Sequence, residues 1–221
     1  MNLSHYIDVF FNKYYPLTIL NRIILRTRNK KEKITILCAN CIGGIIYHNL
    51  GLRFYSPTVN LTIINSSFIK FLHNQSYYLG LSPIEVNGTI DSRFPNARIG
   101  DLDLIFNHSE NFQDGCSKWN NRKKRIIEDE KYVIVFDYLL SDKDIADLGK
   151  VDCKKLVCFT AKKYPYSYCV HLPNCTEFSD GHLHVSNMLL KNIWGKRKIE
   201  MVFDYVGWLN SEDDVAEHFR R

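Results

Sequence analysis

Short β-branched runs alternate with amphipathic segments along most of this chain, and this alternation restricts the possible folds more than any other feature. The clearest predicted strand is Lys131-Tyr-Val-Ile-Val-Phe136, and a similar run covers residues 34–39. Continuous apolar runs of this length are typical of strands that are buried on both faces of a sheet. We therefore predict an α/β fold, with a central mixed or mostly parallel sheet covered by helices.

The rest of the chain continues the alternation. We expect further strands at residues 57–64, 101–106, 154–159, 167–172 and 199–203. We expect helices at residues 43–50, 67–79, 111–129, 142–149, 184–194 and 205–218. No internal repeat or low-complexity linker interrupts the sequence after residue 34, so residues 34–221 are predicted to form a single α/β domain.

Residues 1–33 differ in composition from the rest of the chain. They carry seven basic residues against Asp8 and Glu32, an excess equal to the net charge of +5 of the whole chain. The pattern over residues 5–28 predicts an amphipathic helix that is interrupted at Pro16. Such a basic helical arm could dock on the domain, contact a second subunit or an assembly complex, or lie on an anionic membrane surface.

The sequence shows no sign of export or of a membrane span. No apolar run approaches the roughly 18 residues that cross a bilayer. At the N-terminus the basic residues follow the apolar ones, which is the reverse of a secretory signal. The seven cysteines are an odd number, which is unusual for a disulfide framework. We therefore expect a cytoplasmic protein with reduced thiols, at most bound to the inner face of the membrane.

A cysteine opens one of the predicted helices. Cys41 follows the strand at residues 34–39, and Gly43 and Gly44 come shortly after it. Unpaired N–H groups and the helix dipole stabilise an anion at the first turn of a helix. A thiol at this position can therefore have a lowered pKa and act as a nucleophile. A buried structural thiol in a strand-to-helix turn would give the same pattern.

A histidine follows another predicted strand, at the point where a loop begins. Functional sites of α/β proteins collect at such strand ends. A neighbouring imidazole can take the proton of a thiol and return it to a leaving group, so we predict Cys41 and His108 as a catalytic pair. The side chain of Asn40 and the N–H groups near Gly43 and Gly44 would stabilise an oxyanion. The competing interpretation is that His108 caps the next helix or is merely exposed.

A basic run follows the histidine loop inside the helix predicted at residues 111–129. Within it, Arg122 and Arg125 would bind a substrate phosphate or another anion, although a solvated helix face has the same composition. Nucleic acid is not an expected partner, because residues 34–221 are electroneutral and contain no base-reading motif.

Neither a metal nor a cofactor is expected. Cys38-x-x-Cys41 could be a redox dithiol or half of a zinc site, but the sequence has no second pair at this spacing. Asp101-Leu-Asp103 resembles the metal-binding DxD pattern of many glycosyltransferases, which keeps a sugar or sugar-phosphate transferase as an alternative. The P-loop, GxGxxG and GxSxG motifs are absent, so the sequence does not indicate a nucleotide enzyme or a serine hydrolase.

Three longer motifs carry a resemblance: Asn40-Cys-x-Gly-Gly-x-x-Tyr47, Leu50-Gly-Leu-x-x-x-Ser-Pro57 and Phe203-Asp-Tyr-Val-x-Trp-Leu-Asn210. Together they resemble a bacterial family of uncharacterised proteins that are often labelled exopolysaccharide or capsule biosynthesis proteins. The resemblance runs from about residue 33 to residue 210. It implies an α/β fold and a link to surface polysaccharide.

A fainter similarity is to papain-like cysteine peptidases of bacteria. The features that match are Cys41, Gly51-Leu-Arg53, His108 and the basic residues 122–125. This similarity implies that the cysteine and the histidine form a catalytic dyad. Asp137 and Asp142 are the candidates for a third residue that orients the imidazole.

These features lead to two main hypotheses. The first is an exopolysaccharide or capsule biosynthesis enzyme that uses a Cys–His dyad to transfer or remove an acyl group on a sugar or lipid-linked sugar. The second is a non-catalytic accessory or glycan-binding protein, because thirteen Tyr and three Trp residues offer surfaces on which sugars stack. In the second hypothesis Cys41 is structural.

Overall fold

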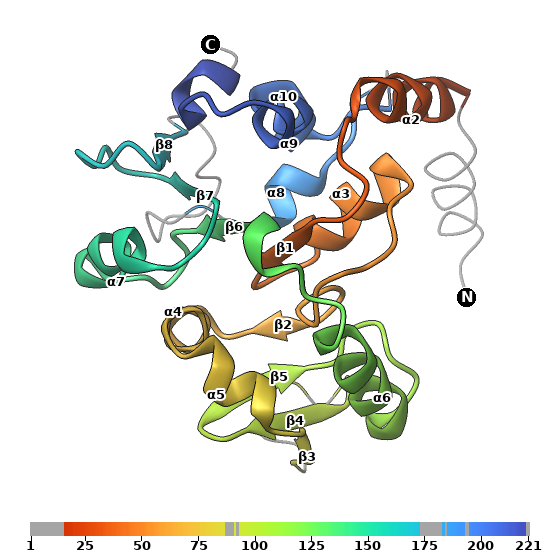
Figure 1. Cartoon of the computed structure of the whole chain (residues 1–221), viewed down its shortest axis with the longest axis vertical. Helices are drawn as coiled ribbons and strands as arrows, with labels where there is room; N and C mark the ends of the chain where they lie inside the picture. Colours follow the sequence, from red (N-terminus) through yellow and green to blue (C-terminus); the bar gives the residue numbers. More distant parts are fainter. Residues whose placement is uncertain are drawn as a thin grey trace.

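Two four-stranded sheets, with helices around them, make up the described part of the chain (Figure 1). The computed structural model describes residues 16–86, 91, 93–172, 183, 185–192 and 195–219. The mixed α/β class predicted from the sequence is confirmed. The strands do not share one mixed sheet, however, because one sheet is parallel and the other antiparallel.

The parallel sheet forms the centre of the molecule. Its strands lie in the order β1 (Thr35–Cys38), β6 (Lys131–Phe136), β7 (Lys155–Thr160) and β8 (Cys169–His171). Every residue of β1 and β6 is buried, as the continuous apolar runs predicted. Because neighbouring strands are parallel, their carboxyl ends lie at one edge of the sheet.

Helices from both ends of the chain cover one face of this sheet. Ile36, Ile134 and Phe159 point into a core shared with these helices. The helices are α2 (Pro16–Arg28), α3 (Ile42–Leu50), α8 (Val185–Leu189), α9 (Lys198–Val202) and α10 (Tyr205–Asn210).

A second core lies against the opposite face, where Leu37, Val133 and Cys158 point. It includes side chains of α4 (Asn65–His73), α5 (Gln75–Gly80), α6 (Phe112–Lys123) and α7 (Asp142–Asp147). Short 3-10 helices at Glu128–Glu130, Leu148–Lys150 and Val215–His218 complete the described helical segments.

The antiparallel sheet packs into this second core, below the parallel sheet in the view of Figure 1. Its order is β2 (Thr62–Ile63), β5 (Leu102–Ile105), β4 (Asn96–Ile99) and β3 (Ile84–Glu85). One hydrogen bond, from the Ile63 amide to the Ala39 carbonyl at 3.1 Å, ties β2 to the end of β1. The sheet therefore brings the carboxyl end of β5 toward the start of α3.

The described part of the basic arm docks on the domain. In α2, Leu25 is buried and the amide of Asn21 donates to the buried Glu200 carboxylate at 2.8 Å. Arg28 forms an ion pair with Asp204 of the C-terminal segment. The opposite side of α2 exposes four apolar residues, Ile19, Leu20, Ile23 and Ile24. The rest of the predicted arm, residues 1–15, lies outside the described residues.

Several predicted elements differ from the structure. The strand expected at residues 199–203 is wrong, because α9 is a helix in which the Glu200 side chain accepts from the Arg197 amide at 3.3 Å. The segment 57–64 is a strand only at Thr62–Ile63, since residues 57–60 form turns. The helix expected at residues 67–79 is two helices that meet at Asn74, whose backbone is not helical.

Candidate functional site

The fold brings Cys41 and His108 together, although 67 residues separate them in the sequence. Cys41 Sγ lies 3.4 Å from His108 Nε2. Cys41 is half-buried and His108 is exposed. At this distance the thiol can donate to Nε2 when the ring proton is on Nδ1. The predicted pair is therefore within hydrogen-bond reach.

Asn40 sets the position of the thiol at the start of α3. Its Oδ1 accepts from the Ile42 amide at 3.1 Å, an Asx turn that comes directly before the helix, whose N-cap residue is Cys41. Cys41 itself has helical φ and ψ angles of −71° and −10°, and its carbonyl accepts from the Ile45 amide at 3.0 Å. The thiol thus stands on the first turn of the helix, as the sequence predicted.

The histidine is held by a turn between β5 and α6. The Ser109 amide donates to the Phe106 carbonyl at 3.1 Å and closes the turn. The Lys118 ammonium donates to the His108 carbonyl at 3.0 Å and to the Asp114 carboxylate at 2.6 Å. The loop is therefore fastened to the first two turns of α6.

Burial raises the pKa of the Cys41 thiol above its ordinary value. This direction is opposite to the lowered pKa that the helix N-terminus led us to expect, because loss of water around the sulfur disfavours the thiolate. The resting thiol is therefore protonated at neutral pH. A nucleophilic Cys41 would need a base at the moment of attack, and the imidazole is the neighbouring group that can supply it.

Two hydrogen-bond donors stand free beside the thiol. Within the described parts of the chain, neither the Asn40 Nδ2 group nor the backbone N–H of Cys41 has a hydrogen-bond partner. Asn40 Oδ1 is occupied by the Ile42 amide and by the Cys38 thiol, so its amino group is the part of the side chain left to bind a ligand.

The glycine pair has a packing role in the structure. A Cβ atom at Gly44 would lie 2.2 Å from Asn60 Oδ1, and one at Gly43 would lie 3.4 Å from the Cβ atom of Cys38. The Gly43 amide donates toward the Cys38 sulfur, and not toward the sulfur of Cys41. The two glycines let α3 approach its neighbours. The N–H of Gly43 is already used by the Cys38 sulfur and is therefore not a free donor for the predicted oxyanion site.

The residues behind the alternative metal and redox interpretations have other partners in the structure. Cys38 is fully buried, donates to Asn40 at 3.1 Å, and has its pKa raised to about 12 by burial. Asp101 accepts from the Tyr78 hydroxyl at 2.7 Å, and Asp103 pairs with Arg98 at 2.7 Å. Neither arrangement presents the pair of open ligands that each motif suggested.

The candidates for a third residue also have other partners. The Asp137 carboxylate accepts from the amides of Ala161 at 2.6 Å and Leu183 at 2.9 Å. Asp142 accepts from the Tyr164 hydroxyl at 2.6 Å. Within the described chain, the Cys41 thiol is the one polar partner of the His108 ring. The arrangement is a dyad.

The predicted anion-binding arginines lie on one side of a cavity of about 430 Å³ between α6 and residues 52–54. Arg122 donates to the Val59 carbonyl at 2.7 Å, and Arg125 donates to the Phe54 carbonyl at 3.4 Å. The structure adds Arg53 and Lys118 to this lining, which the sequence analysis did not select. Helical spacing is the signal that indicates Lys118, because Lys118 and Arg122 are four residues apart in α6 and lie on one helix face, whereas Arg125 follows the end of the helix.

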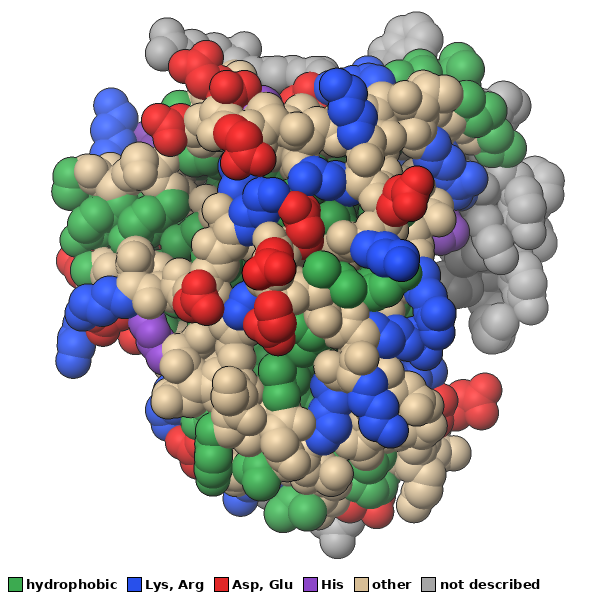
Figure 2. All heavy atoms as spheres, in the orientation of Figure 1, with side chains coloured by type: hydrophobic (Ala, Val, Ile, Leu, Met, Phe, Trp, Pro, Cys, Tyr) green, Lys and Arg blue, Asp and Glu red, His purple; other side chains and the backbone are tan. Residues whose placement is uncertain are grey.

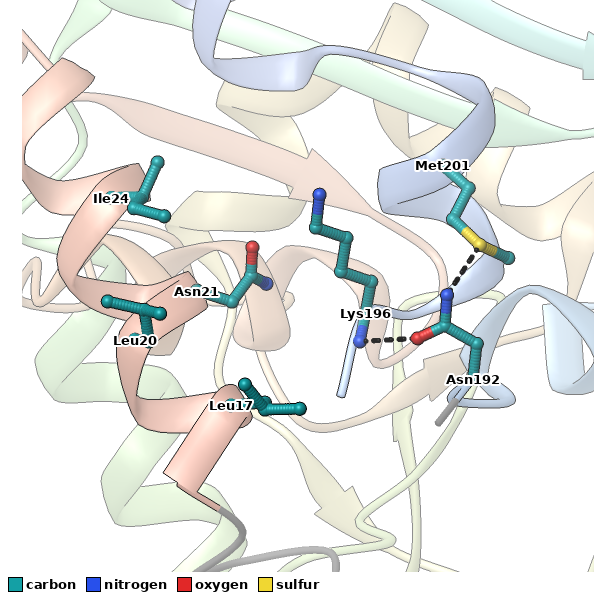
Figure 3. A pocket seen from close by; sticks show the side chains of 7 residues that line it. All are labelled: Leu17, Leu20, Asn21, Ile24, Asn192, Lys196 and Met201. Carbon is teal, nitrogen blue, oxygen red and sulfur yellow. Dashed lines mark hydrogen bonds between the residues drawn. The ribbon is translucent and has the colours of Figure 1, made fainter. Parts of the chain in front are cut away.

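A second cavity, of about 480 Å³, lies between α2 and the C-terminal segment (Figure 3). Leu17, Leu20, Ile24 and Met201 make its described wall mostly apolar, and Lys196 is the one ionisable residue among the described lining residues. None of these described residues is a cysteine or a histidine. The predicted thiol chemistry therefore belongs to the first turn of α3.

Residues 13–210 match the family described as domain of unknown function (DUF1919). The chain belongs to this family. An uncharacterized protein of Haemophilus influenzae is 29% identical over 192 residues, which are 86% of this chain and 90% of that relative. The expected membership of an uncharacterised family is confirmed, while the polysaccharide and papain-like assignments stay predictions. Neither description names a reaction, so the chemistry has to follow from the geometry.

Within the described ranges, no helix combines the length and the apolar character that crossing a bilayer requires.

Proposed function

We propose that this protein transfers or hydrolyses an acyl group through a thioester on Cys41, with His108 as the general base. The substrate would be an acylated sugar or lipid-linked sugar, in the assembly of a surface polysaccharide. The observation that carries the chemistry is the 3.4 Å distance between Cys41 Sγ and His108 Nε2. The resemblance of the Asn-Cys-x-Gly-Gly motif supports the sugar context.

The dyad would act in two half-reactions. Nε2 takes the thiol proton as Sγ attacks the carbonyl carbon of the ester, so that an S–C bond forms. The ester C–O bond then breaks, and the imidazolium returns the proton to the leaving alcohol oxygen. In the second half-reaction water or an acceptor hydroxyl gives its proton to Nε2 and attacks the thioester, which releases the acyl group and restores the thiol.

Attack on the ester carbonyl gives a tetrahedral intermediate with a negatively charged oxygen, and the start of α3 supplies groups that can stabilise this charge. The Cys41 N–H and the Asn40 amino group are free donors at the same turn, and negative charge is also stabilised by the helix N-terminus. Removal of one oxyanion donor typically lowers kcat by about 10²–10³-fold. These donors are the second support for an acyl reaction.

A first test uses p-nitrophenyl acetate, an activated ester that reports acylation of a thiol. Cys153 offers a matched control, because it is also half-buried and burial raises its pKa to about 11, but it has no histidine partner among the described residues. We expect the wild-type protein to be acylated at Cys41. Cys41→Ala should abolish this reaction, and Cys153→Ala should leave it unchanged.

Acylation that survives in Cys41→Ala would contradict the proposal. The same result would favour the accessory or glycan-binding alternative, which the raised pKa of the Cys41 thiol also suits. A sugar or sugar-phosphate transferase is the remaining alternative, and a requirement for manganese would support it.

A further inference from the structure

The cavity beside α6 collects positive charge on all of its sides. Arg53 and Phe54 form one wall, and Lys118, Arg122 and Arg125 form the other. No Asp or Glu is among the described residues that line it. Figure 2 shows Lys and Arg side chains gathered over the position of α6. The described lining therefore holds four cationic side chains, and the one carboxylate that pairs with any of them is that of Asp114.

Three of these cations have no acidic partner. Lys118 pairs with Asp114 at 2.6 Å, whereas Arg53, Arg122 and Arg125 form no ion pair with any residue in the described ranges. Burial, followed by the charge of Arg125, lowers the pKa of Arg122, and the charge of Asp114 offsets only part of this shift. A half-buried guanidinium next to a like charge is an unfavourable arrangement, and a bound anion relieves it.

The arginines are held in place even though they are unpaired. Arg122 Nη1 donates to the Val59 carbonyl at 2.7 Å, and its guanidinium lies 5.1 Å from the centre of the Phe54 ring. Arg125 Nη1 donates to the Phe54 carbonyl at 3.4 Å. Each contact leaves further N–H groups of the planar fork free to bind paired oxygens.

We propose that this cavity binds the phosphate or pyrophosphate group of the substrate on which the dyad acts. Arginine forks match the paired oxygens of phosphates, and three uncompensated charges suit a group that carries more than one negative charge. A cavity of about 430 Å³ lies within the range of small-ligand sites. The inference names the substrate class and rests on the proposed function for its catalytic meaning.

The cavity is connected to the dyad through α6. Lys118 lines it and also donates to the His108 carbonyl at 3.0 Å. Arg125 lies in the turn that follows the end of α6 at Lys123, so Lys118 is the lining residue that joins the cavity to the dyad. A phosphate held in the cavity would therefore lie beside the helix that fastens the His108 loop.

The test measures binding of inorganic pyrophosphate to the full chain by isothermal titration calorimetry. We expect one site, with affinity that falls as salt is added. Arg125→Gln and the exposed Arg53→Gln should each weaken binding at least about tenfold, the loss of one charge-assisted hydrogen bond. Lys124→Gln is the matched control, because this exposed neighbour does not line the cavity, and its affinity should stay within about twofold of wild type.

Phosphatidylglycerol vesicles form a second arm, which distinguishes a lipid headgroup from a soluble phosphorylated compound. Vesicle sedimentation that Arg125→Gln abolishes and pyrophosphate displaces supports the headgroup as the source of the phosphate. Pyrophosphate binding without sedimentation supports a soluble compound. The inference is overturned if neither probe binds, or if Lys124→Gln weakens binding as much as Arg125→Gln does.

Cys41→Ala separates this inference from the proposed function. The variant should bind pyrophosphate with wild-type affinity, because the thiol does not line the cavity. Pyrophosphate binding by a protein that is not acylated would leave the anion site in place and remove the acyl reaction. Acylation at Cys41 without any pyrophosphate binding would have the opposite meaning.

Discussion

Asn40 has two separable functions at the scale of a single residue. Its Oδ1 accepts from the Ile42 amide just before α3, while its Nδ2 group has no partner among the described residues. A Ser hydroxyl can accept the same kind of local backbone hydrogen bond, but Ser has no amide donor. Replacing the side chain can therefore remove one function and keep the other.

We predict that Asn40→Ser retains the free energy of unfolding to within about 0.5 kcal/mol and lowers acylation of Cys41 about 10²-fold. Asn40→Ala should show the same loss of acylation and also lose about 1 kcal/mol of stability, because the hydrogen bond to the Ile42 amide is gone. Urea unfolding and the p-nitrophenyl acetate assay measure the two effects. Full acylation in Asn40→Ser would show that the amino group is not an oxyanion donor.

At the scale of one element, the approach of α3 to its neighbours depends on Gly44 far more than on Gly43. The Cβ atom of an alanine at position 44 would lie 2.2 Å from Asn60 Oδ1, which is inside any allowed contact. At position 43 the nearest atom would be at an ordinary van der Waals distance of 3.4 Å. Asn60 has a φ of 60°, a backbone conformation that glycine adopts more easily.

We predict that Gly44→Ala lowers the free energy of unfolding by about 1–3 kcal/mol, because an extra methyl group overpacks the helix interface. Gly43→Ala should be neutral or should stabilise the helix by up to about 1 kcal/mol. Adding Asn60→Gly to Gly44→Ala should recover most of the loss, since it removes the colliding side chain and suits the positive φ. Urea unfolding of the four proteins tests this. Equal losses at positions 43 and 44 would contradict it.

In the same helix, some features could be predicted from local sequence and others could not. The strand-to-helix turn, the N-terminal position of Cys41 and the end of the helix at Gly51 all follow from local residue patterns. The pKa of the thiol could not be predicted, because it depends on burial by segments that are distant in the sequence. Residues 199–203 suggested a strand, but they lie mostly in α9, where Glu200 is buried and accepts from the distant Asn21 and Asn49 side chains.

At the scale of the whole molecule, the antiparallel sheet is the part that the sequence could not place. Its strands are only two to four residues long, too short for a clear periodicity, and β2 and β5 lie in segments that predicted longer strands. This sheet nevertheless decides the site, because it carries the end of β5 and therefore His108 to the first turn of α3. The positions of Cys41 and His108 after predicted strands were enough to predict the pair. The antiparallel sheet that brings them together could not be predicted from the sequence.

We expect this long-range contact to activate a thiol that burial keeps protonated. The most direct measurement is the rate of iodoacetamide alkylation at Cys41 against pH, in the wild type and in His108→Gln, followed by mass spectrometry. Cys153, with a pKa raised to about 11 by burial, serves as the internal reference in each sample.

A raised thiol pKa means that the thiolate is scarce at pH 7 and accumulates only as the pH rises through that value. At pH 7 the wild type should therefore react about 10²-fold faster than His108→Gln, the usual contribution of a general base. The two rates should converge as the pH rises through the raised pKa of the thiol, where it ionises without help. Rates that coincide at every pH would contradict the account.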